Sequence, residues 1–80
     1  MNSHRILNTL GMRCPETIMM LRKNIRSMQV DEKLLFITDD TTALRDIPIF
    51  CEFMNHSLIH QYIKDIPYYF FIKKGKLNVL

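Results

Sequence analysis

Four apolar residues near the start of the chain recur at spacings of three, four and three: Ile18, Leu21, Ile25 and Met28. That period is typical of an amphipathic α-helix with one face in a core. The opposite side carries the basic residues Arg22, Lys23 and Arg26. The sequence therefore predicts a helix that starts at Pro15 and gives way to a turn at residues 29–32.

Four other segments show the patterns of β-strands. Residues 4–10 alternate in polarity, which predicts a short strand with one buried face. Residues 33–38 form a nearly all-apolar run and are predicted to be a central strand. Residues 58–63 and 68–73 are rich in β-forming side chains, and the short polar segment 64–67 between them indicates a hairpin.

A second helical pattern lies between the central strand and the hairpin. It consists of apolar residues one helical turn apart, namely Leu44, Ile47, Phe50 or Cys51, and Met54. Residues 39–42 offer several candidate N-caps, and Asn55 and His56 mark its end. Pro48 interrupts the pattern, so the sequence predicts either a kink or a helix that restarts near Pro48 with Asp46 as its cap.

The element order is therefore β-α-β-α-β-β, which places the chain in the α/β class. We expect a two-layer α/β sandwich, with a four-stranded mixed sheet and two helices on one face. Eighty residues suffice for one small domain spanning 1–80, with a loose tail at about 77–80. We expect a monomer when the protein is free.

Composition and charge exclude several classes of protein. The longest apolar runs are far below the roughly 20 residues needed to cross a membrane. Residues 1–14 lack the apolar region of a signal peptide, so we expect no membrane partner and a cytoplasmic location. The net charge of +3 is compatible with binding to an acidic protein surface and with a weak attraction to RNA, and it does not distinguish between them.

Cys14 stands out because a glycine turn precedes it and Pro15 and Glu16 follow it. Proline is favoured at the first helical position, which would make Cys14 the N-cap, facing free backbone N–H groups and the positive end of the helix dipole. Arg13 adds a positive charge of the same sense. A thiolate is favoured there, so we interpret Cys14 as a nucleophile rather than a small buried hydrophobe.

Cys51 is the only other cysteine, 37 positions further along the chain. In a reducing cytosol two free thiols are favoured over a disulfide. Cys51 lies on the apolar side of the second predicted helix, so we interpret it as a core residue. A resolving thiol is the alternative.

The remaining polar residues give weaker signals. His56 and His60 are four apart, but on a strand four residues span about 13 Å, too far for one ion, so no metal site is predicted. Arg22, Lys23 and Arg26 form either a docking surface for an acidic partner or an ordinary solvated helix face. Lys73, Lys74 and Lys76 are candidate RNA contacts, although no aromatic motif supports this.

Several motifs together resemble the TusA/SirA family of small sulfur-carrier proteins over about residues 7–75. They are, in order, residues 10–16 with Cys14-Pro15-Glu16, then 39–40, 45–48, 50–51 and 53–54. The branch that serves tRNA thiolation is the most similar. The family motif commonly has a second proline two places after the first, where this chain has Thr17. We expect that change to soften the segment without abolishing its function.

The resemblance implies a two-layer α/β fold and a sulfur relay. Cys14 would accept a persulfide from a cysteine desulfurase, and Arg13, Pro15 and Glu16 would support it. We expect the negative charge of Glu16 to interact with the helix dipole rather than to take part in acid–base chemistry. The sulfur would pass to a downstream relay complex and end in 2-thiouridine at the tRNA wobble position, with tRNA involved only indirectly.

On this interpretation the protein is a carrier rather than a stand-alone enzyme. Its sulfur is held covalently, so no cofactor is expected. The alternatives are a regulatory or redox-sensing module in which Cys14 is oxidised, a carrier for another pathway such as molybdenum cofactor synthesis or sulfur oxidation, and a nucleic-acid-binding domain.

Overall fold

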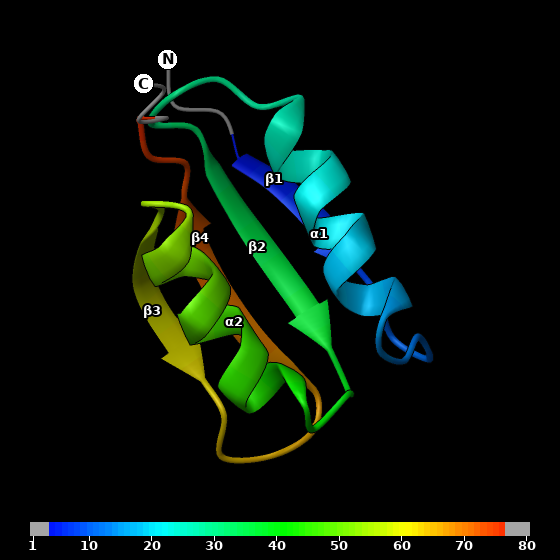
Figure 1. Cartoon of the computed structure of the whole chain (residues 1–80). Helices are drawn as coiled ribbons and strands as arrows, with labels where there is room; N and C mark the ends of the chain where they lie inside the picture. Colours follow the sequence, from blue (N-terminus) through cyan, green and yellow to red (C-terminus); the bar gives the residue numbers. More distant parts are fainter. Residues whose placement is uncertain (1–3, 77–80) are drawn as a thin grey trace.

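Six elements follow one another in the order β-α-β-α-β-β (Figure 1). In the computed structural model, which describes residues 4–76, they are β1 (His4–Asn8), α1 (Glu16–Arg26), β2 (Lys33–Thr38), α2 (Ala43–Phe53), β3 (Ser57–Tyr62) and β4 (Tyr68–Lys73). The strands form one mixed sheet in the order β1-β2-β4-β3. The predicted element order and the predicted α/β fold class are therefore confirmed.

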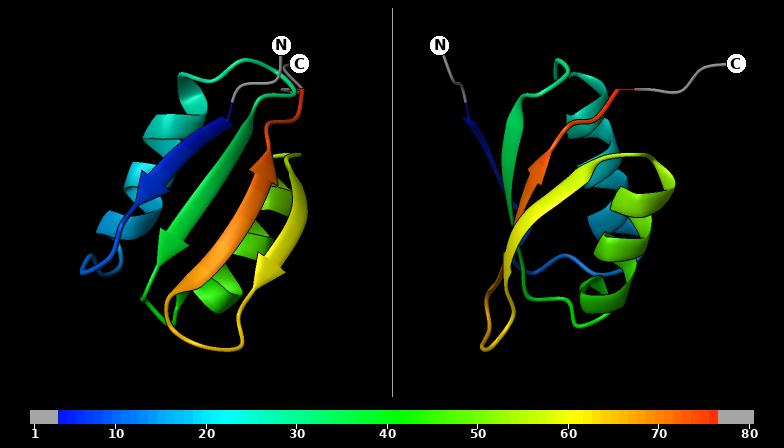
Figure 2. Two further views of the ribbon diagram at one scale, coloured as in Figure 1. Left: turned by 180° about the vertical axis from the view of Figure 1, so that it is seen from behind. Right: turned by 90° about the vertical axis from the view of Figure 1, so that its left-hand side faces the viewer.

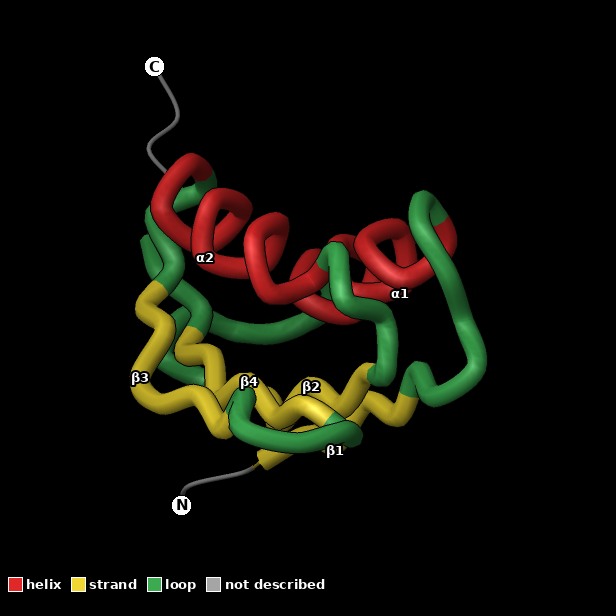
Figure 3. Tube along the Cα trace, turned by 90° about the horizontal axis from the view of Figure 1, so that it is seen from below, coloured by secondary structure: helices red, strands yellow, loops and turns green. Residues whose placement is uncertain are grey.

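The two helices pack on the same face of the sheet, so the molecule has two layers (Figures 2 and 3). β1 and β2 are parallel, while β4 pairs antiparallel with both β2 and β3. The hairpin predicted from the last two β-rich runs is thus present. The parallel pair has a consequence for the site, because the carboxyl ends of β1 and β2 lie at the same edge of the sheet.

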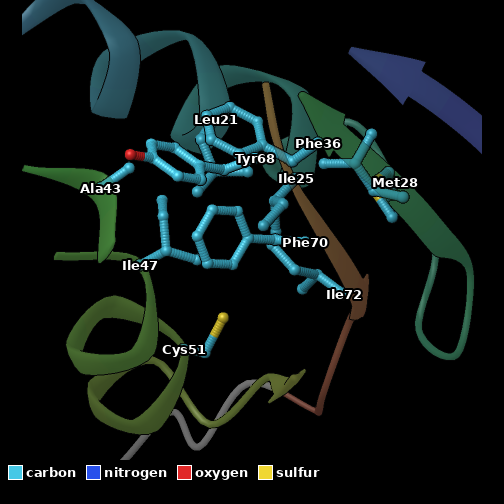
Figure 4. Close-up of a cluster of buried hydrophobic side chains, with 11 residues drawn as sticks. Leu21, Ile25, Met28, Phe36, Ala43, Ile47, Cys51, Tyr68, Phe70 and Ile72 are labelled. Atoms are coloured by element: carbon cyan, nitrogen blue, oxygen red, sulfur yellow. The ribbon is translucent and has the colours of Figure 1, made fainter. Parts of the chain in front are cut away.

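The core lies between the helices and the sheet. The helices contribute residues from their predicted apolar stripes, and β2 and β4 contribute every second residue, as a strand with one buried face must. The most deeply buried hydrophobic residues, all 0% exposed, are Leu21, Leu34, Phe36, Ile47, Phe70 and Ile72. Most of these side chains converge in Figure 4, where the ring of Phe70 lies at the centre of the group.

The opposite face of the sheet has no helix over it (Figure 3). The register aligns Ile6 of β1 with Leu35 of β2, and Leu35 with Phe71 of β4. Ile6 is 69% exposed. On β1 the alternation therefore turns Leu7, rather than Ile6, toward the helices and the core.

Several predicted boundaries are corrected by one or two residues. β1 ends at Asn8 rather than at residue 10, because the chain turns there, and β3 begins and ends one residue before the predicted range 58–63. α2 runs without a break through Pro48, so the predicted restart at Asp46 is wrong. Pro48 is the sixth residue of the helix, and its missing N–H removes one backbone hydrogen bond. The expected tail at 77–80 lies outside the described residues.

Lys74 is buried and bound to backbone carbonyls, which argues against the RNA contact considered for this side chain. It is 7% exposed, and its Nζ donates to the carbonyl oxygen of Met28 at 2.6 Å and to that of Arg26 at 3.5 Å. These carbonyls lie at and just beyond the end of α1, where unpaired C=O groups favour a cation. Lys74 therefore stabilises the C-terminal end of α1.

His56 is also a structural residue. Its Nδ1 accepts a hydrogen bond from the backbone N–H of Gly75 at 3.0 Å, and its ring packs on Phe50 at 5.7 Å. Burial, and then the charge of Lys74, lower its pKa, so the neutral imidazole is favoured. A side chain on Gly75 would collide with the carbonyl of Asn55, which explains the glycine. Within residues 4–76, no group of three or more His, Cys, Asp or Glu is placed to hold a metal ion.

No helix in the described part of the chain is long and apolar enough to cross a membrane.

Candidate functional site

Cys14 lies in the loop between β1 and α1, residues 9–15, which we call the Cys14 loop. Two consecutive turns build it. The first is closed by the N–H of Met12, which donates to the carbonyl of Thr9 at 3.0 Å. Gly11 has φ = 89° in this turn, a conformation that glycine adopts at low cost. The second is closed by the N–H of Glu16, which donates to the carbonyl of Arg13 at 2.8 Å.

Cys14 and Pro15 are the two central residues of the second turn, and the peptide bond between them is cis. Pro15 is the N-cap of α1, with φ = −90° and ψ = 0°, and Glu16 is the first helical residue. The prediction of Cys14 as N-cap and Pro15 as first helical residue is therefore wrong by one position. The reason is that ψ of Pro15 lies away from the helical value of about −42°. Cys14 is placed at the exposed corner of a turn.

Two aspartates at the end of β2 hold the Cys14 loop in place. Asp39 Oδ1 accepts hydrogen bonds from the N–H of Gly11 at 3.0 Å and from Arg13 Nη1 at 2.8 Å. Asp40 Oδ2 accepts one from the N–H of Cys14 at 2.8 Å. The backbone of Cys14 is thus tied to the sheet, while its side chain remains exposed.

Asp40 also joins the Cys14 loop to the start of α2. Its Oδ1 accepts hydrogen bonds from the N–H of Thr42 at 3.0 Å and from the hydroxyl of Thr42 at 2.9 Å. The carboxylate is 4% exposed. Burial opposes its charged form and is the largest single effect, but the hydrogen bonds from Thr42 and Cys14 and the charge of Arg13 together hold the pKa of Asp40 below its usual value.

Arg13 is occupied by an ion pair. The hydrogen bond from Gly11, and then that from Arg13, lower the pKa of Asp39, so this aspartate is charged at neutral pH. Arg13 Nη1 lies 2.8 Å from it. The sequence suggested a positive charge beside the sulfur, and in the structure Arg13 also fixes the loop through its ion pair with Asp39. Glu16 is exposed in the first turn of α1, where a negative charge suits the helix dipole.

A small cavity opens beside Cys14, between the first turns of the two helices. Its volume is about 10 Å³. The residues that line it are Cys14, Thr17, Ile18, Asp40, Thr42, Ala43, Asp46 and Ile47. The exposed thiol therefore adjoins both open solvent and a sheltered space.

Comparison with known protein families is decisive at this point. A family model described as sulfurtransferase TusA matches residues 5–74, which include the Cys14 loop and the two aspartates. The chain belongs to the TusA sulfurtransferase family. The resemblance drawn from the sequence motifs is thereby confirmed, and the family gives the protein the role of a sulfur carrier that works with relay partners.

Cys51 has the opposite environment to Cys14 in this TusA-family protein. It is 2% exposed and packs in the core from α2 (Figure 4). Burial raises the pKa of Cys51 to about 11, so its thiol stays protonated at neutral pH and cannot act readily as a nucleophile. Both cysteines are free thiols.

We predict that Cys51→Ala leaves sulfur transfer near the wild-type rate and lowers the free energy of unfolding by about 1–2 kcal/mol, the range for a small core truncation. Denaturant unfolding measures the stability, and a transfer assay below the melting temperature measures the function. Collapse of transfer in a folded Cys51→Ala protein would instead indicate a redox role for this thiol.

The basic residues predicted as a docking surface do share one surface. Met19, Arg22, Lys23 and Arg26 line a shallow hollow on α1. Arg22 and Arg26 also border a groove of about 110 Å³ whose apolar lining, Ile25, Phe50 and Met54, comes from both helices. Phe53 of α2 is 85% exposed. We call these seven exposed and groove-lining residues, together with Phe53, the helix-face surface.

Asp39 and Asp40 were marked from the sequence as candidate caps for α2 and as one of the family motifs, but not as supports of the Cys14 loop. One signal was available. They follow a predicted central strand, and loops that follow parallel strands meet at the carboxyl edge of a sheet. The loop after β1, which contains Cys14, reaches the same edge.

Proposed function

We propose that Cys14 is the residue on which this TusA-family protein carries sulfur. The observation that carries the proposal is the contrast between the two thiols: Cys14 is exposed at the corner of a turn fixed by Asp40, and Cys51 is buried. A carrier needs a thiol that can reach the donor, and that a later acceptor can reach in turn.

The loading step is an exchange between a thiolate and a persulfide. The Cys14 thiolate attacks the outer sulfur of a persulfide on the active-site cysteine of a cysteine desulfurase. A new S–S bond forms on Cys14 Sγ, the S–S bond of the donor breaks, and the donor cysteine leaves as a thiolate. The reverse kind of attack, by a cysteine of the next carrier, then releases Cys14 as a thiolate.

For the route beyond Cys14 we propose delivery to a downstream relay complex and 2-thiolation of the tRNA wobble uridine. The support is the combined set of motifs in the sequence, which is most similar to the branch that serves tRNA thiolation. The protein itself would contact tRNA only indirectly. Deletion of the gene followed by measurement of thiolated wobble uridine tests this route, and an unchanged level would point to another sulfur acceptor.

Incubation with a cysteine desulfurase and cysteine tests the carrier role directly. We expect the intact protein to gain the mass of one sulfur atom, and to lose it on treatment with a thiol reductant. A protein that gains no sulfur, but in which Cys14 is reversibly oxidised, would be a redox sensor instead.

We further propose that the desulfurase docks on the helix-face surface. The surface combines exposed apolar side chains with Arg22, Lys23 and Arg26, a mixture that suits an acidic partner with an apolar contact area. The groove of this surface lies further along the same two helices whose first turns line the cavity beside Cys14. A partner bound there can place its own reactive sulfur at the Cys14 loop.

We predict that Arg22→Glu and Arg26→Glu each slow sulfur acceptance and reduce its dependence on salt, because rim charges act mainly on the association rate. The transfer rate at low and high salt measures the effect. Lys33→Glu is the matched control, since it makes the same change in net charge on a strand. Equal transfer rates for all three variants would mean that the two arginines belong to an ordinary solvated helix face and do not contact the desulfurase.

A further inference from the structure

Buried polar groups in proteins are nearly always hydrogen-bonded, and the hydroxyl of Thr17 is an exception. Thr17 is 4% exposed, and among the described residues its Oγ1 is the one buried side-chain oxygen or nitrogen without a hydrogen-bond partner. A buried hydroxyl without a partner costs free energy that valine, of nearly the same shape, would not cost. Such a group calls for a ligand or a function.

Thr17 lines the cavity beside Cys14. The cavity, at about 10 Å³, has room for about one water-sized group. Its position next to a sulfur-carrying residue suggests which group that is. A persulfide places one additional atom, the outer sulfur, one bond beyond Cys14 Sγ.

The other polar side chains of the cavity are already engaged. The Thr42 hydroxyl donates to Asp40 Oδ1, and the two oxygens of Asp40 together accept three hydrogen bonds. Asp46 lies 3.5 Å from Arg45 Nε in an ion pair. The hydroxyl of Thr17 is therefore the side-chain donor of this cavity that remains available to a ligand.

We propose that the cavity binds the outer sulfur of the Cys14 persulfide and that the Thr17 hydroxyl donates a hydrogen bond to it. This inference rests on the proposed function, because it requires a persulfide on Cys14. No bond forms or breaks at Thr17. The hydroxyl positions the outer sulfur.

Sheltering the outer sulfur has a consequence for the carrier. A persulfide exposed at the corner of a turn is open to any thiol in solution, which would remove the sulfur before the next partner arrives. A sulfur held between the first turns of α1 and α2 is less accessible to such thiols. A partner that docks at the Cys14 loop can still draw it out, since the cavity opens beside the exposed thiol.

The test compares the lifetime of the loaded protein in three variants. Wild-type, Thr17→Val and Thr17→Ser proteins are loaded with a desulfurase and cysteine, separated from it, and exposed to a fixed concentration of a small thiol. Mass spectrometry then follows the loss of the extra sulfur. We expect Thr17→Val to lose it about three- to tenfold faster, the effect of one net hydrogen bond, and Thr17→Ser to stay near wild type.

A thermal melt of each unloaded protein separates this role from a structural one. We expect Thr17→Val to melt at the wild-type temperature or above, because it removes an unpaired buried hydroxyl. Thr17→Ala provides a second variant without the hydroxyl should the valine fit badly, and its loaded form should also lose sulfur faster than Thr17→Ser.

Two results would overturn the inference while leaving the carrier role intact. One is a loaded Thr17→Val protein with the wild-type lifetime, which would mean that the cavity holds only water. The other is a Thr17→Ser protein as short-lived as Thr17→Val, which would show that packing by the methyl group matters and the hydroxyl does not. If wild-type protein takes up no sulfur at all, the proposed function itself fails.

Discussion

Replacing Cys14 by serine should abolish persulfide loading completely and leave the fold intact. A serine hydroxyl is not ionised at neutral pH, and its oxygen cannot form the S–S bond on which the sulfur is carried. The fold should survive because the Cys14 side chain is exposed and the hydrogen bond to Asp40 comes from the backbone N–H. The mass of the intact protein after incubation with a desulfurase and cysteine measures the loading.

Cys51→Ser is the matched control, because it makes the same chemical change at the buried thiol. That variant should load one sulfur atom at a temperature where it is folded. If Cys14→Ser still takes up sulfur, and the variant with both cysteines replaced by serine does not, then Cys51 is the residue that carries sulfur. It would also require the core around α2 to open, which the raised pKa and burial of Cys51 disfavour.

The fold could be predicted because its signals are local. The stripe of Leu21 and Ile25, one helical turn apart, defines the buried face of α1 regardless of what packs on it. The β-rich runs after residue 57 lie close in sequence and pair as a hairpin. Pro48 shows the limit of local rules. A single proline costs one helical hydrogen bond, and the burial of Ile47 and Cys51 on either side offsets that loss.

The site was only half predictable, because its supports come from distant parts of the chain. Cys14 was found from its own neighbours, Pro15 and Glu16. Its anchor, Asp40, is 26 residues away, and only the parallel pairing of β1 and β2 brings the two together.

The surroundings of Lys74 and Thr17 could not be predicted from the sequence for a related reason. The charge of Lys74 suggested an exposed cation until its hydrogen bond to the Met28 carbonyl, 46 residues away, was known. The burial of the Thr17 hydroxyl depends on how α1 meets α2. No pattern within one segment reveals that contact.

Among the residues of the site other than Cys14, we expect Asp40 to be the one whose replacement most reduces stability and sulfur loading. Asp40→Ala leaves the N–H groups of Cys14 and Thr42 without their acceptor. We expect a loss of about 3 kcal/mol in the free energy of unfolding, because buried donors lose a charged partner. Sulfur loading should slow as well, since the backbone of Cys14 loses its hydrogen bond to the segment that follows β2.

Asp39→Ala is the matched control for that variant. It removes the hydrogen bonds to Gly11 and Arg13 of the Cys14 loop, but the Asp39 side chain is 25% exposed and water can replace it. Urea unfolding of both variants ranks them. A smaller loss for Asp40→Ala than for Asp39→Ala would contradict the role of Asp40 as the buried anchor.

Acid should weaken the protein through the same two carboxylates. Their pKa values are lower in the folded protein than their ordinary value, so the folded state binds their protons less readily than the unfolded chain does. The stability that they contribute is therefore fully present above the unfolded pKa of about 4, and is lost as the pH falls through the folded values.

In Asp40→Asn one of these groups no longer titrates. The free energy of unfolding of that variant, measured in urea between neutral pH and pH of about 3, should fall less steeply than that of wild type. Curves of equal slope would mean that the hydrogen bonds to Asp40 do not depend on its charge.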